Sequence, residues 1–258
     1  MKNLPQNQVS SETPKLLVIW AWTQIGVHVI CGVCTLSFIF PFLDRRNKDR
    51  KIQEWSKHLL KIFHIELLVQ GAGLLKHAPH LIASNHISWL DIHVINAFRP
   101  IRFVAKSEVA GWPIFGWMAQ QLGTVFIRRD SARHARKVVG QMAEVLKTES
   151  ICIFPEGTST VGATVLPFKP NLFESAIVTQ TLVFPLAIQY LSKVTGERSE
   201  SPAFIGDMGL LESMANTIKN RSLVAKITIL EPYISSPQNT PDRKNVANYC
   251  QDSIAKAL

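Results

Sequence analysis

Cysteine is scarce in this chain, and its four cysteines follow no regular spacing. Disulfide-stapled proteins carry a denser and more ordered set, so we expect no disulfide framework and a reducing compartment. Cys152 lies within an apolar run and is expected to be a small residue of the core. With 258 residues, 47% of them hydrophobic, the chain is long enough for one folded domain and an additional segment.

Several function classes lack their sequence signatures here. The chain has no glycine-rich nucleotide loop and no zinc-finger spacing. It has no Gly-x-Ser-x-Gly nucleophile elbow, which argues against a serine hydrolase. The net charge is +9, but the basic residues are not interleaved with aromatic residues as they are in single-strand binders. The basic excess therefore favours an anionic membrane surface or an anionic small molecule, and not nucleic acid, as the partner.

Charged side chains are absent from residues 16–43. An apolar stretch of about 18 residues or more is long enough to cross a bilayer as a helix. Basic residues follow directly between positions 45 and 51, which predicts that the rest of the chain lies on the cytoplasmic side. Because the stretch also contains glycine, proline and several polar residues, a re-entrant or half-buried anchor is an alternative to a straight span.

Residues 48–68 predict a basic amphipathic helix, with Ile52, Trp55 and Leu59 along one side. Such a helix can lie on anionic lipid, where each nearby Lys or Arg contributes roughly 1 kcal/mol. It can equally be an ordinary surface helix packed on the domain. The periodicity alone favours neither interpretation.

From residue 80 onward, short apolar runs alternate with helical patterns, which predicts an α/β domain with a mainly parallel central sheet covered by helices. Segments 192–222 and 232–243 are polar and are expected to be irregular. The expected helices lie near residues 89–98, 108–120, 131–148 and 171–180. The expected strands are 81–84, 101–105, 124–127, 151–154, 182–189 and 225–230.

The segment after the first of these strands contains His86 and, five residues later, Asp91. At 100° per residue, two such side chains cannot meet within a regular helix. They can meet if His86 lies on the strand-to-helix turn and Asp91 in the first helical turn. A carboxylate on one imidazole nitrogen fixes the tautomer and leaves the other nitrogen to accept a proton. The alternative is a plain helix N-terminus, with Ser88 as the cap and Asp91 as an acidic first-turn residue.

Two further segments end predicted strands with residues that can bind a substrate, and a third predicted strand contains a proline. Arg128 and Arg129 close a hydrophobic strand, where arginine can clamp a phosphate or simply be solvated. The run Phe154-Pro155-Glu156-Gly157-Thr158 offers a turn that can hold an anion and a carboxylate for substrate hydroxyls, or is a plain turn. Pro185 interrupts an apolar strand and predicts a strand edge or a local break, or equally a core strand with a bulge.

Together, His-x4-Asp, Gly-x-x-Phe-Ile-x-Arg, Phe-Pro-Glu-Gly-Thr and the later apolar-Pro strand resemble the four blocks of the glycerolipid acyltransferase family, typified by 1-acylglycerol-3-phosphate acyltransferase. The resemblance covers roughly residues 75–190. It implies transfer of a fatty acyl group from acyl-CoA or acyl carrier protein to the free hydroxyl of a lysolipid. It implies neither a covalent acyl-enzyme nor a metal, and no cofactor beyond the acyl donor.

By this resemblance His86 is the general base and Asp91 its partner. The substrate-binding residues that it implies are Arg129, Glu156, Gly157, Thr158 and Lys106. We expect a disordered segment 1–15, a membrane anchor 16–43 and an acyltransferase domain 44–258. The expected location is the bacterial inner membrane, with the catalytic domain on its cytoplasmic side.

The chain departs from the common family pattern at positions that bear on the acceptor. Arg128 replaces the usual acid before the second-block arginine, and Ser159 replaces the arginine that usually follows Phe-Pro-Glu-Gly-Thr. The second feature resembles the bacterial branch that includes lyso-ornithine-lipid acyltransferases. We predict 1-acyl-sn-glycerol-3-phosphate as the acceptor, with a lyso-ornithine lipid or another lysolipid as the alternative. A catalytically silent membrane-binding scaffold is a third possibility, against which the intact His86 and Asp91 argue.

Overall fold

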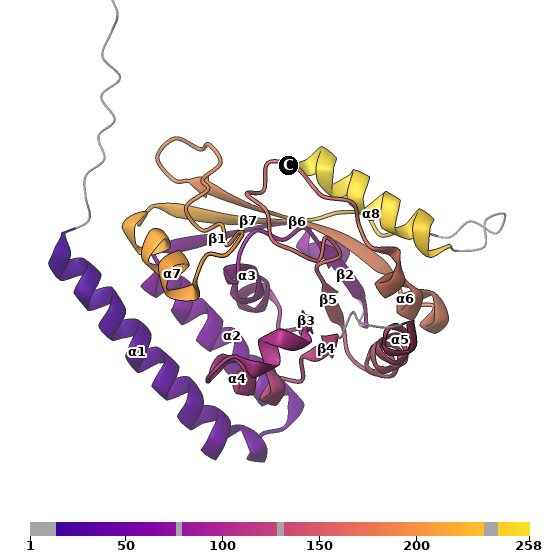
Figure 1. Cartoon of the computed structure of the whole chain (residues 1–258), viewed down its shortest axis with the longest axis horizontal. Coiled ribbons are helices and arrows are strands. Elements are labelled where there is room, and N and C mark those ends of the chain that lie inside the picture. Colours follow the sequence, from indigo (N-terminus) through magenta and orange to yellow (C-terminus); the bar gives the residue numbers. More distant parts are fainter. Residues whose placement is uncertain (1–13, 76–78, 128–131, 235–241) are drawn as a thin grey trace, which may run out of the picture.

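A seven-stranded sheet forms the centre of the molecule, in the order β1-β7-β6-β2-β5-β3-β4. The computed structural model describes residues 14–75, 79–127, 132–234 and 242–258 (Figure 1). Neighbouring strands run parallel except for the antiparallel pair β6 and β7, which confirms the predicted mainly parallel sheet. The strands are β1 Ile65–Gln70, β2 Leu81–Ser84, β3 Arg102–Lys106, β4 Val125–Ile127, β5 Ile151–Ile153, β6 Val183–Ser192 and β7 Leu223–Ile229.

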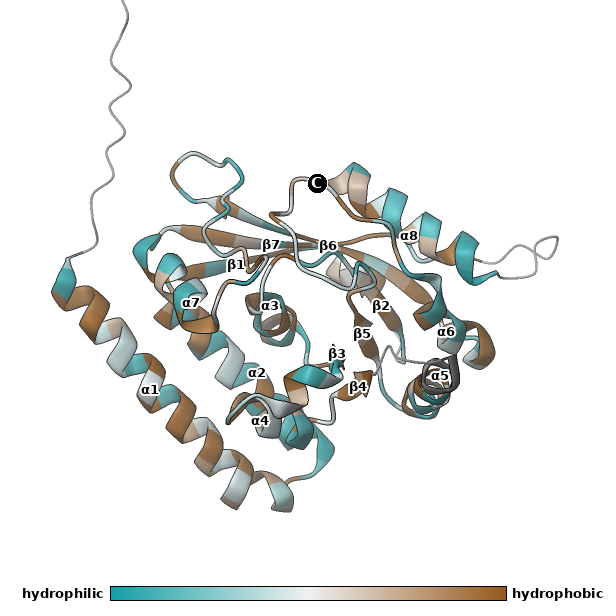
Figure 2. Ribbon diagram, in the orientation of Figure 1, coloured by the Kyte–Doolittle hydropathy of each residue, from teal (hydrophilic) through white to brown (hydrophobic). Residues whose placement is uncertain are grey.

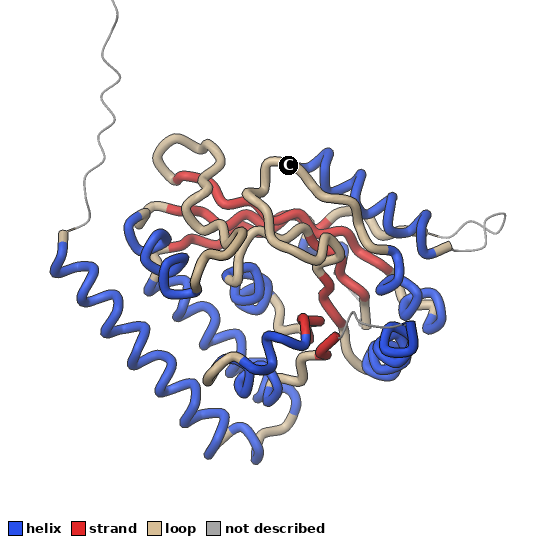
Figure 3. The backbone as a smooth tube through the Cα atoms, viewed as in Figure 1, coloured by secondary structure: helices blue, strands red, loops and turns tan. Residues whose placement is uncertain are grey.

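Helices cover both faces of this sheet, as the tube in Figure 3 shows. One apolar core lies between the sheet and α1, α2, α3 and α7, and a second lies between the sheet and α5, α6 and α8. The central strands β2 and β5 are buried along their whole length, which explains their continuous apolar sequences. The helices are α1 Lys15–Phe38, α2 Arg45–Ile62, α3 Leu90–Phe98, α4 Phe115–Gln121, α5 Ala132–Leu146, α6 Glu174–Thr179, α7 Leu210–Lys219 and α8 Arg243–Ala257.

Two predictions about secondary structure were wrong. The helix expected over 48–68 ends at Ile62, and Ile65–Gln70 forms strand β1 beside β7. Helix α7 also forms within the segment 192–222 that was expected to be irregular. At β1 tertiary packing overrides the local sequence pattern, because the strand gains a parallel partner distant in sequence. Helix α7 instead follows its local pattern, since Met214 and Ile218 recur at helical spacing on its buried side.

Pro185 lies in β6, where the sequence indicated a strand edge or a break. The antiparallel ladder with β7 begins at Leu186, so the proline falls one residue beyond it. Its carbonyl still accepts a hydrogen bond from the Leu230 amide at 3.0 Å. The missing N–H of proline is therefore placed where the ladder with β7 has already ended.

Helix α1 lies along the domain with one side packed inward and the other exposed. Its buried residues recur every three or four positions and so form one helical face: Ala21, Ile25, His28, Gly32 and Leu36. The opposite side exposes large apolar residues, visible as brown bands along α1 in Figure 2: Leu16, Ile19, Trp20, Val27, Ile30 and Phe38. Among the described residues, α1 is the one helix long and apolar enough to cross a membrane, judged by length and composition alone.

The basic helix α2 is packed on the domain along its apolar side. Leu59, Leu60 and Ile62 belong to the main core, and α2 contacts both α3 and α1. The Trp55 indole stacks on the His28 ring of α1 with 4.3 Å between ring centroids. The apolar side of α2 is therefore not free to lie on lipid, and of the two interpretations left open by the sequence the packed helix is observed.

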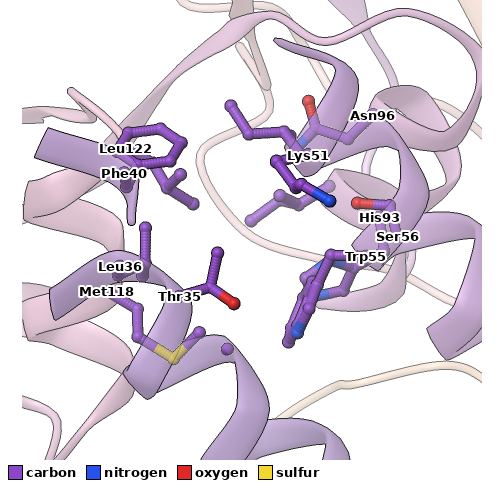
Figure 4. A pocket seen from close by; sticks show the side chains of 13 residues that line it. Thr35, Leu36, Phe40, Lys51, Trp55, Ser56, His93, Asn96, Met118 and Leu122 are labelled. Atoms are coloured by element: carbon purple, nitrogen blue, oxygen red, sulfur yellow. The ribbon is translucent and has the colours of Figure 1, made fainter. Parts of the chain in front are cut away.

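A small apolar crevice of about 70 Å³ lies where α1, α2, α3 and α4 meet (Figure 4). Gly32 lies at this contact, because a Cβ atom there would come within 2.8 Å of Trp55 Nε1 and 3.1 Å of Met118 Cε. The Trp55 indole is itself fixed, since it donates to the His28 carbonyl at 3.3 Å. The close approach of α1 to α2 thus depends on a residue without a side chain.

We predict that Gly32→Ala lowers the free energy of unfolding by about 1–3 kcal/mol, because the added methyl group overpacks the contact with Trp55. Gly26→Ala is the matched control in the same helix, where nothing lies within 4 Å of the new Cβ. It should be neutral or stabilising by up to about 1 kcal/mol through helix propensity. Thermal unfolding of both detergent-solubilised variants checks this, and equal stability of the two would contradict the proposed contact.

Candidate active site

His86 and Asp91 meet at the carboxyl end of β2. The strand ends at Ser84, the chain turns through His86, and α3 begins at Leu90. Asp91 therefore lies in the first helical turn and faces back, so that His86 Nδ1 lies 2.8 Å from Asp91 Oδ2. The imidazole is 22% exposed and the carboxylate is fully buried. This is the geometry that the five-residue spacing requires for the two side chains to interact.

The Asp91 carboxylate is held by three further donors. Its Oδ2 atom accepts from the amides of Ile87 at 2.7 Å and Ser88 at 3.0 Å, and its Oδ1 atom accepts from the Tyr190 hydroxyl at 2.8 Å. These bonds compensate a charge that burial would otherwise penalise. Because an ionised carboxylate only accepts, Nδ1 of His86 carries the proton and Nε2 is the basic nitrogen.

The His86 ring is oriented from one side by an aromatic stack. It lies parallel to the Phe154 ring with centroids 4.1 Å apart, and Phe154 in turn stacks on Phe103 at 6.1 Å. Phe154 directly follows β5, and Phe103 lies on β3. Three neighbouring strands therefore contribute to the orientation of one imidazole.

Asn85 bonds to β6 from the turn between β2 and α3, residues 85–89, which is called the catalytic turn below because it carries His86. Its side-chain amide donates to the Ile188 carbonyl at 3.0 Å, and its side-chain oxygen accepts from the Ile188 amide at 2.8 Å. The side chain thus replaces the main chain of β2 as the partner of β6 just where β2 ends. His86 is fixed at its position because the side chain of the residue before it makes two hydrogen bonds to Ile188.

Glu156 does not face the open side of His86. Its Oε1 accepts from the His86 amide at 2.7 Å and its Oε2 from the Leu166 amide at 2.9 Å, and the residue is 3% exposed. Burial raises the pKa of this carboxyl above its usual range, and the two amide bonds oppose that shift. These contacts make Glu156 a brace between the catalytic turn and the loop after β5. Binding of substrate hydroxyls by its carboxylate stays a prediction.

That loop closes over the catalytic turn by main-chain contacts. Gly157 has φ of +76°, a conformation that favours glycine, and so allows the sharp turn after Glu156. The Thr160 amide then donates to the His86 carbonyl at 2.9 Å. The Ser159 hydroxyl donates to the Phe204 carbonyl, and the Phe204 amide donates to the Ile87 carbonyl at 2.9 Å. Ser159 therefore joins two loops and does not stand free toward a substrate.

The predicted substrate-binding residues Lys106 and Thr158 lie at the same edge of the sheet. Lys106 ends β3 and is exposed, and Thr158 follows β5 and is also exposed. Because β2, β5, β3 and β4 are parallel neighbours, their carboxyl ends share one edge with His86. Arg129 follows β4 but lies outside the described residues. Among the described residues, no group of three or more His, Cys, Asp or Glu side chains could hold a metal ion.

Sequence reasoning missed Tyr190 and the structural role of Asn85. Tyr190 lies 99 positions after Asp91, and Asn85 bonds to a strand 103 positions away. Asn85 stood inside the predicted motif, and a polar residue at the end of a buried strand is the signal that could have drawn attention to it. A tyrosine at the end of an apolar strand carries no comparable signal, because the same pattern is typical of a core aromatic residue.

Comparison with known proteins adds an independent line of evidence. The family model described as Acyltransferase matches residues 66–189. A lyso-ornithine lipid O-acyltransferase of Pseudomonas aeruginosa is 34% identical over 212 residues, covering 82% of this chain and 79% of the relative. A 1-acyl-sn-glycerol-3-phosphate acyltransferase of Neisseria meningitidis is 33% identical over 210 residues, covering 81% and 80%.

The fold also matches a solved structure. The crystal structure of the 1-acyl-sn-glycerophosphate acyltransferase PlsC from Thermotoga maritima superposes with a TM-score of 0.66 at 21% sequence identity. The match covers 94% of this chain and 95% of that one, which extends the similarity beyond the family segment to α1 and to the elements after β6. The family model, the two relatives of more than 30% identity and the shared fold agree with the resemblance read from the motifs. This chain belongs to the acyltransferase family.

Proposed function

We propose that this chain is a lysolipid O-acyltransferase that acylates the free hydroxyl of 1-acyl-sn-glycerol-3-phosphate to give phosphatidic acid. The observation that supports it most is the buried Asp91 carboxylate bonded to His86 Nδ1 at 2.8 Å, which leaves Nε2 as a base at a partly exposed position. The relatives named above act on hydroxyl groups of lysolipids, as their names state. A silent scaffold would have no need of a buried carboxylate with four donors.

In the proposed reaction the acceptor hydroxyl binds against His86 Nε2. His86 removes the hydroxyl proton while the oxygen attacks the carbonyl carbon of the acyl thioester, so that a C–O bond forms and the C–S bond breaks. The imidazolium then returns the proton to the departing thiolate. Asp91 stabilises the imidazolium formed in between. General-base assistance of this kind typically contributes 10²–10⁴-fold.

The acyl donor in this proposal is the thioester of coenzyme A or of acyl carrier protein. Either donor carries a phosphopantetheine group, and the exposed Lys106 at the shared strand edge is suited to its negative charge. The chain requires no further cofactor for this chemistry, because the thioester itself is the activated group.

A second acceptor, a lyso-ornithine lipid, is supported by a specific observation. The Pseudomonas relative with this activity in its name is 34% identical to this chain, and the Neisseria meningitidis relative named for 1-acyl-sn-glycerol-3-phosphate is 33% identical. Ser159 is also engaged with the Phe204 carbonyl, and so adds no positive charge for a phosphate at that position. Both acceptors present a free hydroxyl to the same base, but 1-acyl-sn-glycerol-3-phosphate carries a phosphate and a lyso-ornithine lipid does not.

Membrane association is supported by the exposed apolar side of α1 and by the lipid substrates in the names of the relatives. We place α1 half-embedded in the cytoplasmic surface of the bacterial inner membrane, with its inner side on the domain. Basic residues cluster at the start of α2, where Arg46 and Arg50 line a hollow of about 420 Å³ with Asp44 and Asn47. Such a cluster suits the head groups of an anionic membrane surface.

We predict that the purified full-length protein transfers a labelled acyl group to 1-acyl-sn-glycerol-3-phosphate, and that His86→Ala reduces kcat/KM at least 10²-fold because the base is lost. Asp91→Asn should act similarly by changing the His86 tautomer. Scintillation counting of the acylated product, with a lyso-ornithine lipid and a choline lysolipid offered in parallel, measures both claims.

The matched control is His64→Ala, an exposed histidine in the turn before β1. It should retain wild-type turnover. If the protein acylates the lyso-ornithine lipid alone, that lipid is the acceptor and 1-acyl-sn-glycerol-3-phosphate is not. Substantial activity in His86→Ala would remove the proposed base.

We predict that Glu156→Gln lowers kcat by about tenfold or more while the KM for the acceptor changes little. Glutamine offers one acceptor oxygen, so one of the two amides bonded to Glu156 is left unpaired, which typically costs about 1–3 kcal/mol. Glu212→Gln, exposed on α7, is the matched control. Initial rates at varied acceptor concentration separate the two constants, and a rise confined to the acceptor KM would return Glu156 to the role of a substrate ligand.

We predict that Trp20→Glu combined with Ile30→Glu releases much of the protein from membranes, because both side chains lie on the exposed side of α1, at 57% and 64% exposure. Protein that remains bound should detach in high salt, since attraction between exposed charges is screened. Val194→Glu, 83% exposed after β6, is the control. Vesicle sedimentation measures binding, and unchanged sedimentation of the double variant would exclude α1 as the membrane contact.

A further inference from the structure

Tyr190 is a buried polar contact of the Asp91 carboxylate. It lies in β6, is 1% exposed, and belongs to the main core between the sheet and α3. Its hydroxyl donates to Asp91 Oδ1 at 2.8 Å. The family match ends at residue 189, so Tyr190 lies just outside the segment that carries the family motifs.

The surrounding main chain leaves Tyr190 little freedom. Two positions earlier, Ile188 is bonded through both its amide and its carbonyl to the Asn85 side chain. Residues two apart in a strand point to the same side of the sheet, so this bond also fixes the side toward which Tyr190 points. Tyr190 pairs with Ala225 of β7 on one edge of β6, and on the edge that carries Asn85 its carbonyl accepts from the Ser199 amide at 2.8 Å.

The two oxygens of Asp91 have different environments. Oδ2 accepts from His86 and from two main-chain amides, whereas Tyr190 is the one donor to Oδ1 among the described residues. Burial, and then the Asp91 charge, raise the pKa of the Tyr190 hydroxyl well above its usual range, so it remains a donor at any working pH. A hydrogen bond to a carboxylate stabilises the ionised form and weakens the carboxylate as an acceptor toward its other partners.

We propose that Tyr190 is a positioning residue that acts through Asp91, where its hydroxyl orients the carboxylate and sets the basicity of His86. The inference rests on the proposed roles of His86 and Asp91. Tyr190 itself touches no substrate, because it is buried beneath Asp91.

The direction of the effect follows from the bond that is lost. Without the Tyr190 hydroxyl, the Asp91 carboxylate is more basic and stabilises the His86 imidazolium more strongly, so His86 deprotonates at higher pH. The other titratable groups facing the pair are Glu156, after β5, and the buried Cys152 thiol on β5, and neither is changed by the substitution.

The first experiment is the pH profile of kcat/KM for Tyr190→Phe in the full-length protein. The acid limb should move to higher pH, and kcat should fall about tenfold while the acceptor KM stays unchanged. Tyr249→Phe is the matched control, because the Tyr249 hydroxyl donates to the Glu231 carbonyl at 3.1 Å, far along the chain from the catalytic turn. A variant with reduced activity but the wild-type pH profile would show that Tyr190 only supports the fold, and would overturn the proposal.

A second experiment keeps the hydroxyl and so avoids a folding defect. The chain has three tyrosines, at positions 190, 233 and 249. In the Tyr233→Phe, Tyr249→Phe background, 3-fluorotyrosine incorporated in place of tyrosine labels Tyr190 alone. Its more acidic hydroxyl is the stronger donor, so the acid limb should move to lower pH, opposite to Tyr190→Phe. An unmoved acid limb in the fluorinated protein would overturn the proposal even if Tyr190→Phe fails to fold.

These outcomes are separable from failure of the proposed function. If His86→Ala retains activity, the base assignment fails before Tyr190 is tested. If His86→Ala is inactive and the profiles of both Tyr190 proteins coincide with their controls, only the role of Tyr190 fails.

Discussion

The buried carboxylate of Asp91 is the group on which the arrangement of the active site depends. A fully buried charge is tolerated only with several hydrogen-bond donors, and four converge on this one. They come from the imidazole, from two successive main-chain amides of the turn, and from Tyr190 on the neighbouring strand β6. Because each donor belongs to a different element or turn position, the charge can be satisfied only when β2, α3 and β6 are assembled together.

The catalytic turn is held from three directions by contacts that do not involve substrate. Asn85 bonds to β6, Glu156 bonds to the His86 amide, and the loop after β5 bonds to the His86 carbonyl through Thr160. Such pre-organisation matters for a reaction in which the acceptor hydroxyl must lie against one imidazole nitrogen and against the thioester carbonyl at the same time. The surrounding shell of amide and carbonyl bonds explains how a turn at the edge of a sheet can hold one imidazole in place.

The apolar helix α1 is packed on the domain that carries His86 and Asp91, and is not connected to it by the chain alone. Gly32 and His28 of α1 pack on Trp55 of α2, and α2 packs on α3, the helix that carries Asp91. An ion-pair network adds to this, since Arg45 at the start of α2 pairs with Glu149, which also holds Arg102 of β3. In the proposed membrane-bound state, contact with lipid along α1 would therefore set the height of the active site relative to the bilayer surface.

The sequence alone determined the fold class, the apolar first helix and the pairing of His86 with Asp91. These follow from local signals: hydrophobic periodicity, an uncharged stretch, and a spacing that permits contact only across a strand-to-helix turn. Only the tertiary structure decided the parallel strand β1, the bracing role of Glu156, the engagement of Ser159 and the donor Tyr190. Each of these depends on a partner tens of residues away or more, and a local pattern carries no information about which distant atom fills a hydrogen-bond position.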